Sequence, residues 1–390
     1  MGSKENKKTI RIFLWASFLN DMGSDMIYPI WPLFVTTVLK ADMTALGFLD
    51  GLGEALASVS QAASGYLSDR IRKRKVFIWL GYLCGAISRI GYGLSVTWQH
   101  LIPFRILDRA GKMRGAPRDA VIADLSAKEN RGRNFGLLRA MDNLGAVCGI
   151  LLCIVLAGPL EYRNLFLLAA LPTAIGTFLV FSMIKEQKAY SSKIYKEPAL
   201  SLSKGLALKD LDNNFKLFLF LSVLFSLGSF SYSFLLIYAR SLGFKASFVP
   251  VLYLVFTAVA AIFSLPFGRL SDKVGRKTVL VMSYILWGIV SLCFLFFKSH
   301  AAIFLAFFLY GLHKAALEPV QKTFVAELAP AQYRASALGG FQMMTGLCAL
   351  PASLAAGLLW DKIGMFMPLF LSLGLTTAAT VMLIFVKEKR

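Results

Sequence analysis

Charged side chains are scarce in this sequence. They make up 16% of its 390 residues, whereas soluble domains carry about 25%. Hydrophobic residues reach 57%, more than a soluble core of this size could bury. They fall into runs of roughly 20, the length of a helix that spans a bilayer. The composition therefore excludes an ordinary soluble protein and predicts an all-α membrane protein with several transmembrane helices.

The sequence also lacks the patterns that carry catalysis or hold a cofactor. No CxxC pair occurs, so neither a disulfide framework nor a metal site is indicated. The five cysteines all lie in apolar runs: Cys84, Cys148, Cys153, Cys293 and Cys348. There is no Gly-rich phosphate loop and no nucleophile–base arrangement. We therefore expect neither an enzyme nor an ATP-driven pump, with no cofactor and no bound metal.

The net charge of +20 indicates topology rather than a nucleic-acid partner. Basic residues in short loops mark the cytoplasmic side of a membrane protein. Here they gather at the N-terminus and at 70–75, 128–133, 185–213, 273–277 and 387–390. Both termini are then cytoplasmic, which requires an even number of spans. The first apolar run has no cleavage site and is interpreted as a retained helix.

Twelve apolar segments can be drawn. They cover about 10–38, 43–69, 76–95, 98–125, 134–157, 164–184, 214–239, 246–271, 278–297, 301–328, 334–359 and 365–386. The long polar break at 185–213 is interpreted as a cytoplasmic linker. It separates an N-terminal six-helix bundle, 1–184, from a C-terminal one, 214–390. The short loops favour a bacterial host, and hence a multi-pass protein of the inner (plasma) membrane.

The two halves carry related sequences, which indicates an internal duplication. Gly65-Tyr66-Leu67-Ser68-Asp69-Arg70 is repeated 203 residues later as Gly268-Arg269-Leu270-Ser271-Asp272-Lys273. The same offset aligns Asp124 with Glu327 and Gly136 with Gly339. An even number of helices in each half predicts parallel repeats related by an axis along the membrane normal, with a site at their interface.

These repeated stretches resemble the signature loop of the major facilitator superfamily of secondary transporters, roughly G-x-L-[AS]-D-[RK]-x-G-[RK]-[RK]. The second copy matches throughout, including Gly275, Arg276 and Lys277, whereas the first has Arg72 at the second glycine. The resemblance implies the twelve-helix fold of that family. It also implies a gating motif, in which charge pairs favour one transport state, at Gly65, Asp69, Arg70, Gly268, Asp272, Gly275 and Arg276.

Two further stretches are similar to family motifs. Residues 101–108, with Arg105 and Asp108, look like the motif with a buried arginine that is often tied to proton coupling, although Arg109 replaces its usual glycine. The antiporter glycine run would fall near Gly145 and Gly149, but its proline is absent. The resemblance therefore does not fix the direction of transport.

Charged residues inside apolar segments are costly, about 3 kcal/mol each at mid-bilayer, and mark functional positions. Asp21 and Asp25 lie four apart, on one face of the first helix. One of two paired carboxylates can retain a proton, so both are candidates for proton coupling; the alternative is a structural ion pair with an arginine of the fourth helix. Arg89 requires a counter-ion, either Glu54 or an acid of the fourth helix.

The fourth and fifth segments are the richest in charge. Their candidate substrate or coupling residues are Arg105, Asp108, Arg109, Lys112, Arg114, Arg118, Asp119, Arg139 and Asp142. Arg139 and Asp142, three apart, are expected to pair. An alternative is that the fourth helix ends early and 112–119 is a polar break. The second half adds Tyr232, His313 and Glu318; the alternative for His313 is a structural hydrogen-bonding role.

The leading hypothesis is a proton-coupled secondary transporter that works by alternating access. Surplus Arg and Lys favour a small organic anion or zwitterion, including a metal chelate such as a siderophore, because guanidinium groups bind carboxylate and phosphate well. The alternatives are a lipophilic drug/proton antiporter, an uncoupled facilitator, and a non-transporting receptor or scaffold on the same fold. The expected partners are a small-molecule substrate and the lipid bilayer, with the protein a monomer.

Overall fold

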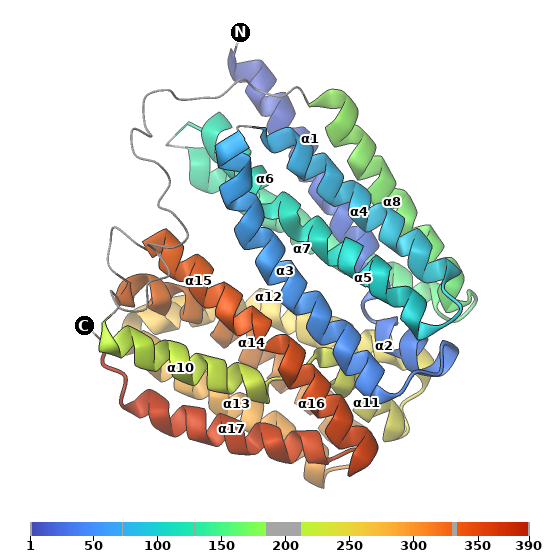
Figure 1. Cartoon of the computed structure of the whole chain (residues 1–390), viewed down its shortest axis with the longest axis vertical. Helices are drawn as coiled ribbons and strands as arrows, with labels where there is room; N and C mark the ends of the chain where they lie inside the picture. The colour runs from blue at the N-terminus through green and yellow to red at the C-terminus, as the bar shows by residue number, and fades with distance from the viewer. Residues whose placement is uncertain (1, 72, 128–129, 185–211, 330–333, 389–390) are drawn as a thin grey trace. The chain divides into compact units, whose positions relative to one another are not determined.

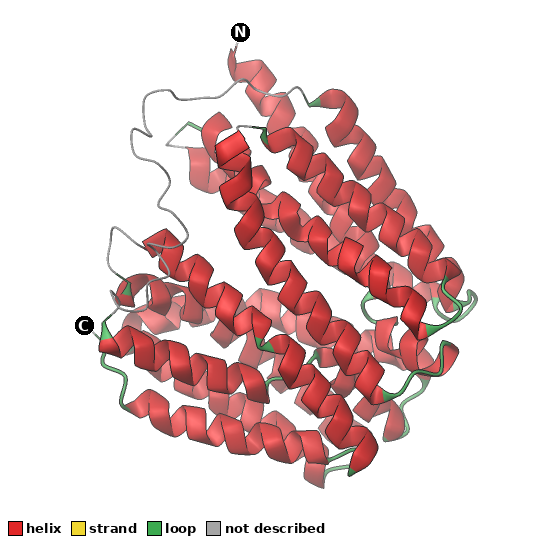
Figure 2. Cartoon of the chain, viewed as in Figure 1, coloured by secondary structure: helices red, strands yellow, loops and turns green. Residues whose placement is uncertain are grey.

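A computed structural model describes residues 2–71, 73–127, 130–184, 212–329 and 334–388. Within these ranges every regular element is a helix (Figure 2). The predicted linker 185–213 falls almost wholly outside the described residues. Contacts divide the chain into two compact units: residues 1–40 with 56–199, and residues 41–55 with 200–390. The predicted boundaries at 184 and 214 stay a prediction.

Unit 1 contains the first helices of the chain (Figure 1). They are α1 (Gly2–Ile27), α2 (Trp31–Leu33), a π-helix (Phe34–Val38), α4 (Arg74–Leu94), α5 (Leu101–Ala110), a 3₁₀ turn (Gly111–Arg114), α6 (Gly115–Leu125), α7 (Arg131–Leu156) and α8 (Tyr162–Met183). The helix α3 (Met43–Ile71) contributes residues 43–55 to unit 2 and the rest to unit 1.

Unit 2 contains the remaining helices. They are α10 (Asn213–Gly228), α11 (Tyr232–Ser241), α12 (Val249–Val274), α13 (Arg276–Phe296), α14 (His300–Leu328), α15 (Arg334–Leu347), α16 (Ala349–Lys362) and α17 (Met367–Ile384). Ring stacking fills its core: the rings of Phe225 and Tyr284 lie 3.9 Å apart and nearly parallel. The indole of Trp287 donates a hydrogen bond to Ser372, 2.8 Å away.

Nine stretches of the described residues are long and apolar enough to cross a membrane. The predicted segments 10–38, 43–69 and 98–125 are not among them. They are nevertheless helical, as α1 to the π-helix, α3, and α5 to α6. Their acidic and basic side chains lower the hydropathy, which is why they fail on composition. The count of twelve spans and the cytoplasmic termini stay predictions.

The helix boundaries in the first segment follow its prolines. α1 ends at Ile27, shortly before Pro29, and Pro32 lies in the first turn of α2, where its missing N–H costs nothing. Beyond it the chain widens into a π-helix at Phe34–Val38. The bend expected from the two prolines is therefore present as a break between α1 and α2.

Glycines allow the closest contacts within unit 1. A Cβ on Gly145 would lie 2.3 Å from the carbonyl oxygen of Phe18, and one on Gly149 would lie 2.2 Å from that of Met22. Both glycines are on α7 and both oxygens on α1. Only residues without a side chain let two helix backbones approach this closely. The glycine run thus has a packing role between α1 and α7.

The fourth segment is helical through its charged part. α5 runs into the 3₁₀ turn at 111–114 and then directly into α6. The turn packs on α4, where a Cβ on Gly81 would lie 2.6 Å from the carbonyl oxygen of Gly111. The polar break considered for 112–119 is therefore wrong, because Pro117 falls in the first turn of α6, where a proline is tolerated.

Candidate functional site

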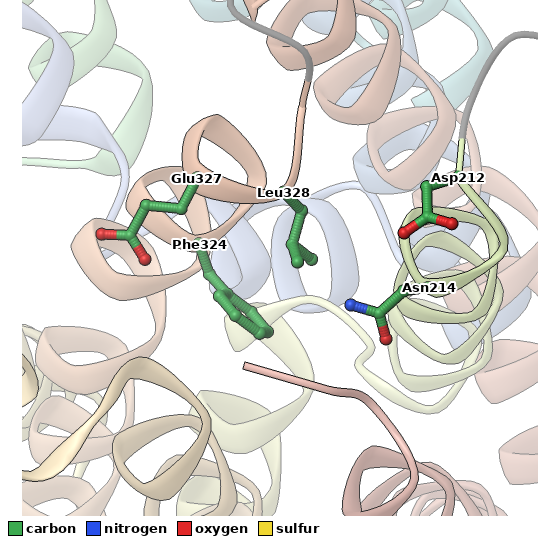
Figure 3. A pocket seen from close by; sticks show the side chains of 5 residues that line it. All are labelled: Asp212, Asn214, Phe324, Glu327 and Leu328. Atoms are coloured by element: carbon green, nitrogen blue, oxygen red, sulfur yellow. The ribbon is translucent and has the colours of Figure 1, made fainter. Parts of the chain in front are cut away.

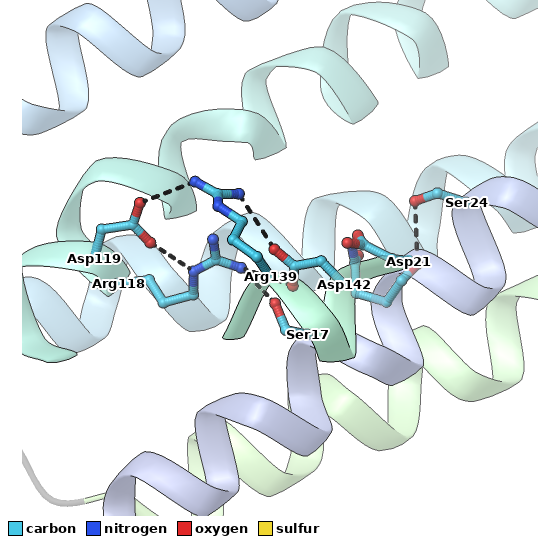
Figure 4. Close-up of polar contacts among 8 residues, drawn as sticks. Ser17, Asp21, Ser24, Arg118, Asp119, Arg139 and Asp142 are labelled. Carbon is cyan, nitrogen blue, oxygen red and sulfur yellow. Dashed lines mark hydrogen bonds and ion pairs between the residues drawn. The ribbon is translucent and has the colours of Figure 1, made fainter. Parts of the chain in front are cut away.

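Arg118 on α6 is the centre of a polar network in unit 1 (Figure 4). Its Nε lies 3.1 Å from Asp119 Oδ1 and a terminal nitrogen lies 3.7 Å from Asp142 Oδ1. The same nitrogen donates a hydrogen bond to the Ser17 hydroxyl on α1. The network therefore joins α1, α6 and α7 through one buried guanidinium.

Arg139 on α7 contacts the same two acids from a more exposed position. It lies 3.3 Å from Asp142 Oδ2, which confirms the predicted pair, and 3.6 Å from Asp119 Oδ2. The Arg139 side chain is 65% exposed, whereas that of Arg118 is 9% exposed. Two arginines thus share two carboxylates, and only one of them is desolvated.

Asp21 on α1 extends toward this network (Figure 4). Its carboxylate accepts a hydrogen bond from the Asn20 amide at 2.8 Å. It is repelled by Asp142 and attracted by Lys112, Arg114 and Arg118. Two acids on neighbouring helices therefore act on each other beside basic groups. Asp25, one turn further along α1, is half-buried.

Arg89 on α4 lies in the interior, 1% exposed. One terminal nitrogen donates to the Ser24 hydroxyl at 2.7 Å, and the other to the Thr173 hydroxyl. Asp108 attracts it electrostatically, in agreement with the expected acid of the fourth helix. The counter-ion is thus supplemented by two hydroxyls, which the sequence analysis did not identify.

Three more arginines of the fourth segment lie over aromatic rings. Each forms a cation–π contact with its guanidinium carbon 4.4 to 5.5 Å from a ring centroid. The pairs are Arg105 with Trp31, Arg109 with Tyr28, and Arg114 with Tyr82. Such contacts stabilise a desolvated cation without neutralising its charge. Arg109 also lies 3.5 Å from Asp108 Oδ2.

In unit 2 the polar residues follow one stripe of α14. Lys314 and Glu318 are four apart, and their charged atoms lie 3.9 Å from each other. The Lys314 ammonium also forms a hydrogen bond with Tyr310 and is attracted by Glu54 of α3. Glu54 and Glu318 are exposed. Exposed charges within helices that span a membrane require a water-filled surface rather than lipid.

His313 lies on the buried side of the same helix. Its Nδ1 is 2.8 Å from the Ser283 carbonyl oxygen, and its ring packs against those of Trp287 and Tyr310. These contacts favour the structural role over a proton role. Tyr232, at the start of α11, is half-buried and packs edge-on against Tyr253. Of the three second-half candidates, only Glu318 lies on the exposed stripe.

The second copy of the predicted gating motif forms a set of ion pairs. Arg276 lies 2.5 Å from Asp272 and 3.1 Å from Glu327. Gly268 has nothing near its Cβ position, while Gly275 has a φ of +101°, which favours glycine. The glycine of the motif is thus explained by the turn between α12 and α13.

The first copy shows a related pair in a shifted register. Arg74 lies 2.5 Å from Asp124, whereas the 203-residue offset aligns Lys73, not Arg74, with Arg276. Arg70 is exposed and Gly65 half-buried. The side chain of Asp69 lies outside the described residues, so its predicted role is untested.

The arrangement can hold charged groups of a ligand and move protons between side chains, but it does not resemble a catalytic centre or a metal site. Among the described residues no group of three or more His, Cys, Asp or Glu side chains could hold a metal ion. The sequence analysis missed Ser17, Ser24, Thr173 and Tyr310. Single hydroxyls in an apolar helix give no pattern; the four-residue spacing of Tyr310 and Lys314 could have indicated the last.

Helices of this length, with charged sites in both units, define a multi-pass integral membrane transporter. The sequence model of the Major Facilitator Superfamily matches residues 13–239 and 217–390. An uncharacterised MFS-type transporter of Methanocaldococcus jannaschii is 38% identical over 367 residues, covering 92% of this chain and 90% of the relative. The chain therefore belongs to the Major Facilitator Superfamily.

More distant relatives include transporters with named substrates. The multidrug resistance protein MdtG of Salmonella paratyphi C is 27% identical, covering 81% of this chain and 80% of the relative. A crystal structure of a mutant of the nucleoside transporter NupG has a TM-score of 0.84 at 15% identity, covering 97% of this chain and all of the other. At that identity the likeness shows the fold alone.

Proposed function

We propose that this chain is a proton-coupled secondary transporter that moves a small organic anion or zwitterion by alternating access. The observation that carries the substrate class is a surplus of two basic groups inside unit 1. Seven basic residues, Arg89, Arg105, Arg109, Lys112, Arg114, Arg118 and Arg139, face five acidic ones, Asp21, Asp25, Asp108, Asp119 and Asp142. A carboxylate or phosphate of the substrate would balance this surplus.

The proton would be carried by Asp21 and Asp142. These carboxylates repel each other across α1 and α7, and a proton bound to either one removes the repulsion. Binding of an anion beside Lys112 and Arg114 would weaken the attraction that keeps Asp21 ionised. Substrate and proton would then bind together, which is the requirement for coupled transport.

In unit 2 we assign substrate contact to Lys314 and Glu318. Their pair is long, at 3.9 Å, and Glu318 is 65% exposed, so an anionic group could replace Glu318 on the ammonium at little cost. The Tyr310 hydroxyl would keep Lys314 in place during the exchange. A carboxylate-rich metal chelate fits the same requirement. The proposed location is the bacterial inner (plasma) membrane, with the chain working as a monomer.

Proton movement in proteoliposomes that enclose a pH-sensitive dye tests the proposal. The probes are citrate, a ferric citrate chelate, a dipeptide, a nucleoside monophosphate and tetraphenylphosphonium. Citrate, chelate or nucleotide should drive proton movement that is lost in both Asp21→Asn and Asp142→Asn. Glu161→Gln, an exposed acid at the start of α8, is the control. Loss in Asp25→Asn alone would instead place the proton one turn further along α1.

A second candidate function is drug/proton antiport. It is favoured by MdtG and by the multi-drug resistance efflux pump PmrA of Streptococcus pneumoniae, which is 26% identical over 83% of this chain. Proton movement driven by tetraphenylphosphonium and by none of the anions would support this function and overturn the anion proposal. Movement of a probe without proton movement would leave an uncoupled facilitator.

A further inference from the structure

Residues 384–388, at and after the end of α17, lie against the first turn of α13. The Glu388 carboxylate accepts hydrogen bonds from the backbone N–H groups of Arg276 and, at 3.4 Å, Lys277. In return, the Lys277 ammonium donates to the carbonyl oxygens of Ile384 and, at 3.1 Å, Val386. The segment and the helix start therefore satisfy each other's terminal groups.

A third element fixes the same segment. The side-chain amide of Asn214, at the start of α10, donates to the Lys387 carbonyl oxygen and accepts from the Lys387 N–H, both at 2.7 Å. Asn214 and Glu327 line one small pocket of about 30 Å³ (Figure 3). The segment thus lies beside the residues that pair with Arg276.

Glu388 supplies what the start of α13 lacks. The residue before the helix is Gly275, which has no side chain to cap the free N–H groups. A carboxylate satisfies such groups and is favoured by the helix dipole. A Cβ at Gly275 would lie 2.7 Å from Glu388 Oε2, so glycine is required here for the approach of the carboxylate as well as for the turn. The corresponding residue of the first repeat is Arg72.

Arg276 connects this contact to the gating motif. Its backbone N–H is held by Glu388, while its guanidinium contacts Asp272 and Glu327 and also donates to the Ser271 hydroxyl. The guanidinium can reach both acids only if the first turn of α13 keeps its place. The Arg276 side chain is 15% exposed, although Asp272 is 62% exposed, which shows that the helix start, rather than the acid, is the fixed partner.

We propose that Glu388 is a positioning residue of the gating motif. By holding the backbone of Arg276, its carboxylate stabilises the ion pairs with Asp272 and Glu327, and with them the transport state that the motif favours. The inference rests on alternating access as proposed above. It needs neither the proton nor the identity of the substrate, so its failure would leave proton coupling intact.

The test measures the populations of the two transport states by double electron–electron resonance on the full chain in nanodiscs. Spin labels are attached at Asn130→Cys and Asn213→Cys, exposed positions in units 1 and 2, after the five native cysteines are replaced. Glu388→Gln should change the population ratio by about fivefold, the size of one lost helix-cap interaction. The change should have the same direction as that of Asp272→Asn, and the double variant should show less than the combined effect.

Glu388→Asp, which keeps the charge, should recover part of the shift, and Glu5→Gln, an exposed acid in the first turn of α1, should cause none. If Glu388→Gln does not fold, Asn214→Ala loosens the segment without removing the carboxylate and should move the ratio in the same direction. Unchanged populations in these variants, or full additivity with Asp272→Asn, would overturn the proposal.

Discussion

The polar network around Arg118 makes a strong prediction about burial. Arg118 and Arg139 contact the same two carboxylates, those of Asp119 and Asp142, at 3.1 to 3.7 Å. They differ in exposure, 9% against 65%. Replacing each with glutamine therefore removes a chemically equivalent group from two environments, and the two variants are matched controls for each other.

The expected magnitudes follow from that difference. Removing one partner of a buried ion pair costs about 3 to 5 kcal/mol, because the remaining charge is left uncompensated. Loss of an exposed pair costs roughly 1 kcal/mol or less. Arg118→Gln should thus lower the free energy of unfolding by about 3 kcal/mol, and its Tm by about 5 °C. Arg139→Gln should lower the Tm by no more than about 2 °C.

Thermal unfolding of the purified protein, followed by intrinsic fluorescence in one detergent, measures both effects. The double variant Arg118→Gln with Asp142→Asn should regain part of the lost stability, because it removes the uncompensated charge as well. Equal Tm losses for the two arginine variants would refute the reasoning, since burial would then not decide the strength of these pairs. A double variant less stable than Arg118→Gln alone would refute it too.

Three further predictions concern packing and caps. Gly149→Ala should lower the Tm by several degrees, because its Cβ would lie 2.2 Å from the Met22 carbonyl oxygen, whereas Gly136→Ala on the same helix, with nothing within 4 Å, should be neutral or stabilising; equal effects would contradict the α1–α7 contact. Asp361→Asn should cost about 1 kcal/mol, because its carboxylate accepts from the Thr44 N–H and hydroxyl at 2.7 and 2.6 Å, with Lys362→Gln as control in the same melts. Arg89→Lys should reduce folded yield on size-exclusion chromatography, because one ammonium cannot replace a fork that contacts Ser24 and Thr173; a wild-type yield would contradict this.

Local features of the fold could be predicted because they depend on residues close in sequence. The prolines at 29 and 32 fixed the end of α1, and the three-residue spacing of Arg139 and Asp142 fixed their pair. The polar break at 112–119 was a wrong alternative, since charge density alone does not end a helix whose charges find partners. Its arginines are held by rings and acids of other helices.

The partners across helices could not be predicted, because helix rotation and register are set by packing. Ser24 and Thr173 are ordinary residues of apolar segments, yet both bind Arg89. His313 looked like a titratable group, but the helix turns it into an aromatic core while Lys314, the next residue, faces the exposed stripe. A one-residue change of register would reverse these two roles.

The glycine contacts between α1 and α7 have a consequence for the acids on those helices. Asp21 lies between Phe18 and Met22, whose carbonyl oxygens contact Gly145 and Gly149, and Asp142 lies one turn before Gly145. Two backbones in such close contact cannot separate a little without losing most of their dispersion energy. The two carboxylates are thus mounted on one rigid body with a fixed spacing. Their repulsion acts as a stored load that helix motion cannot release, and only the arrival of positive charge at the pair can discharge it.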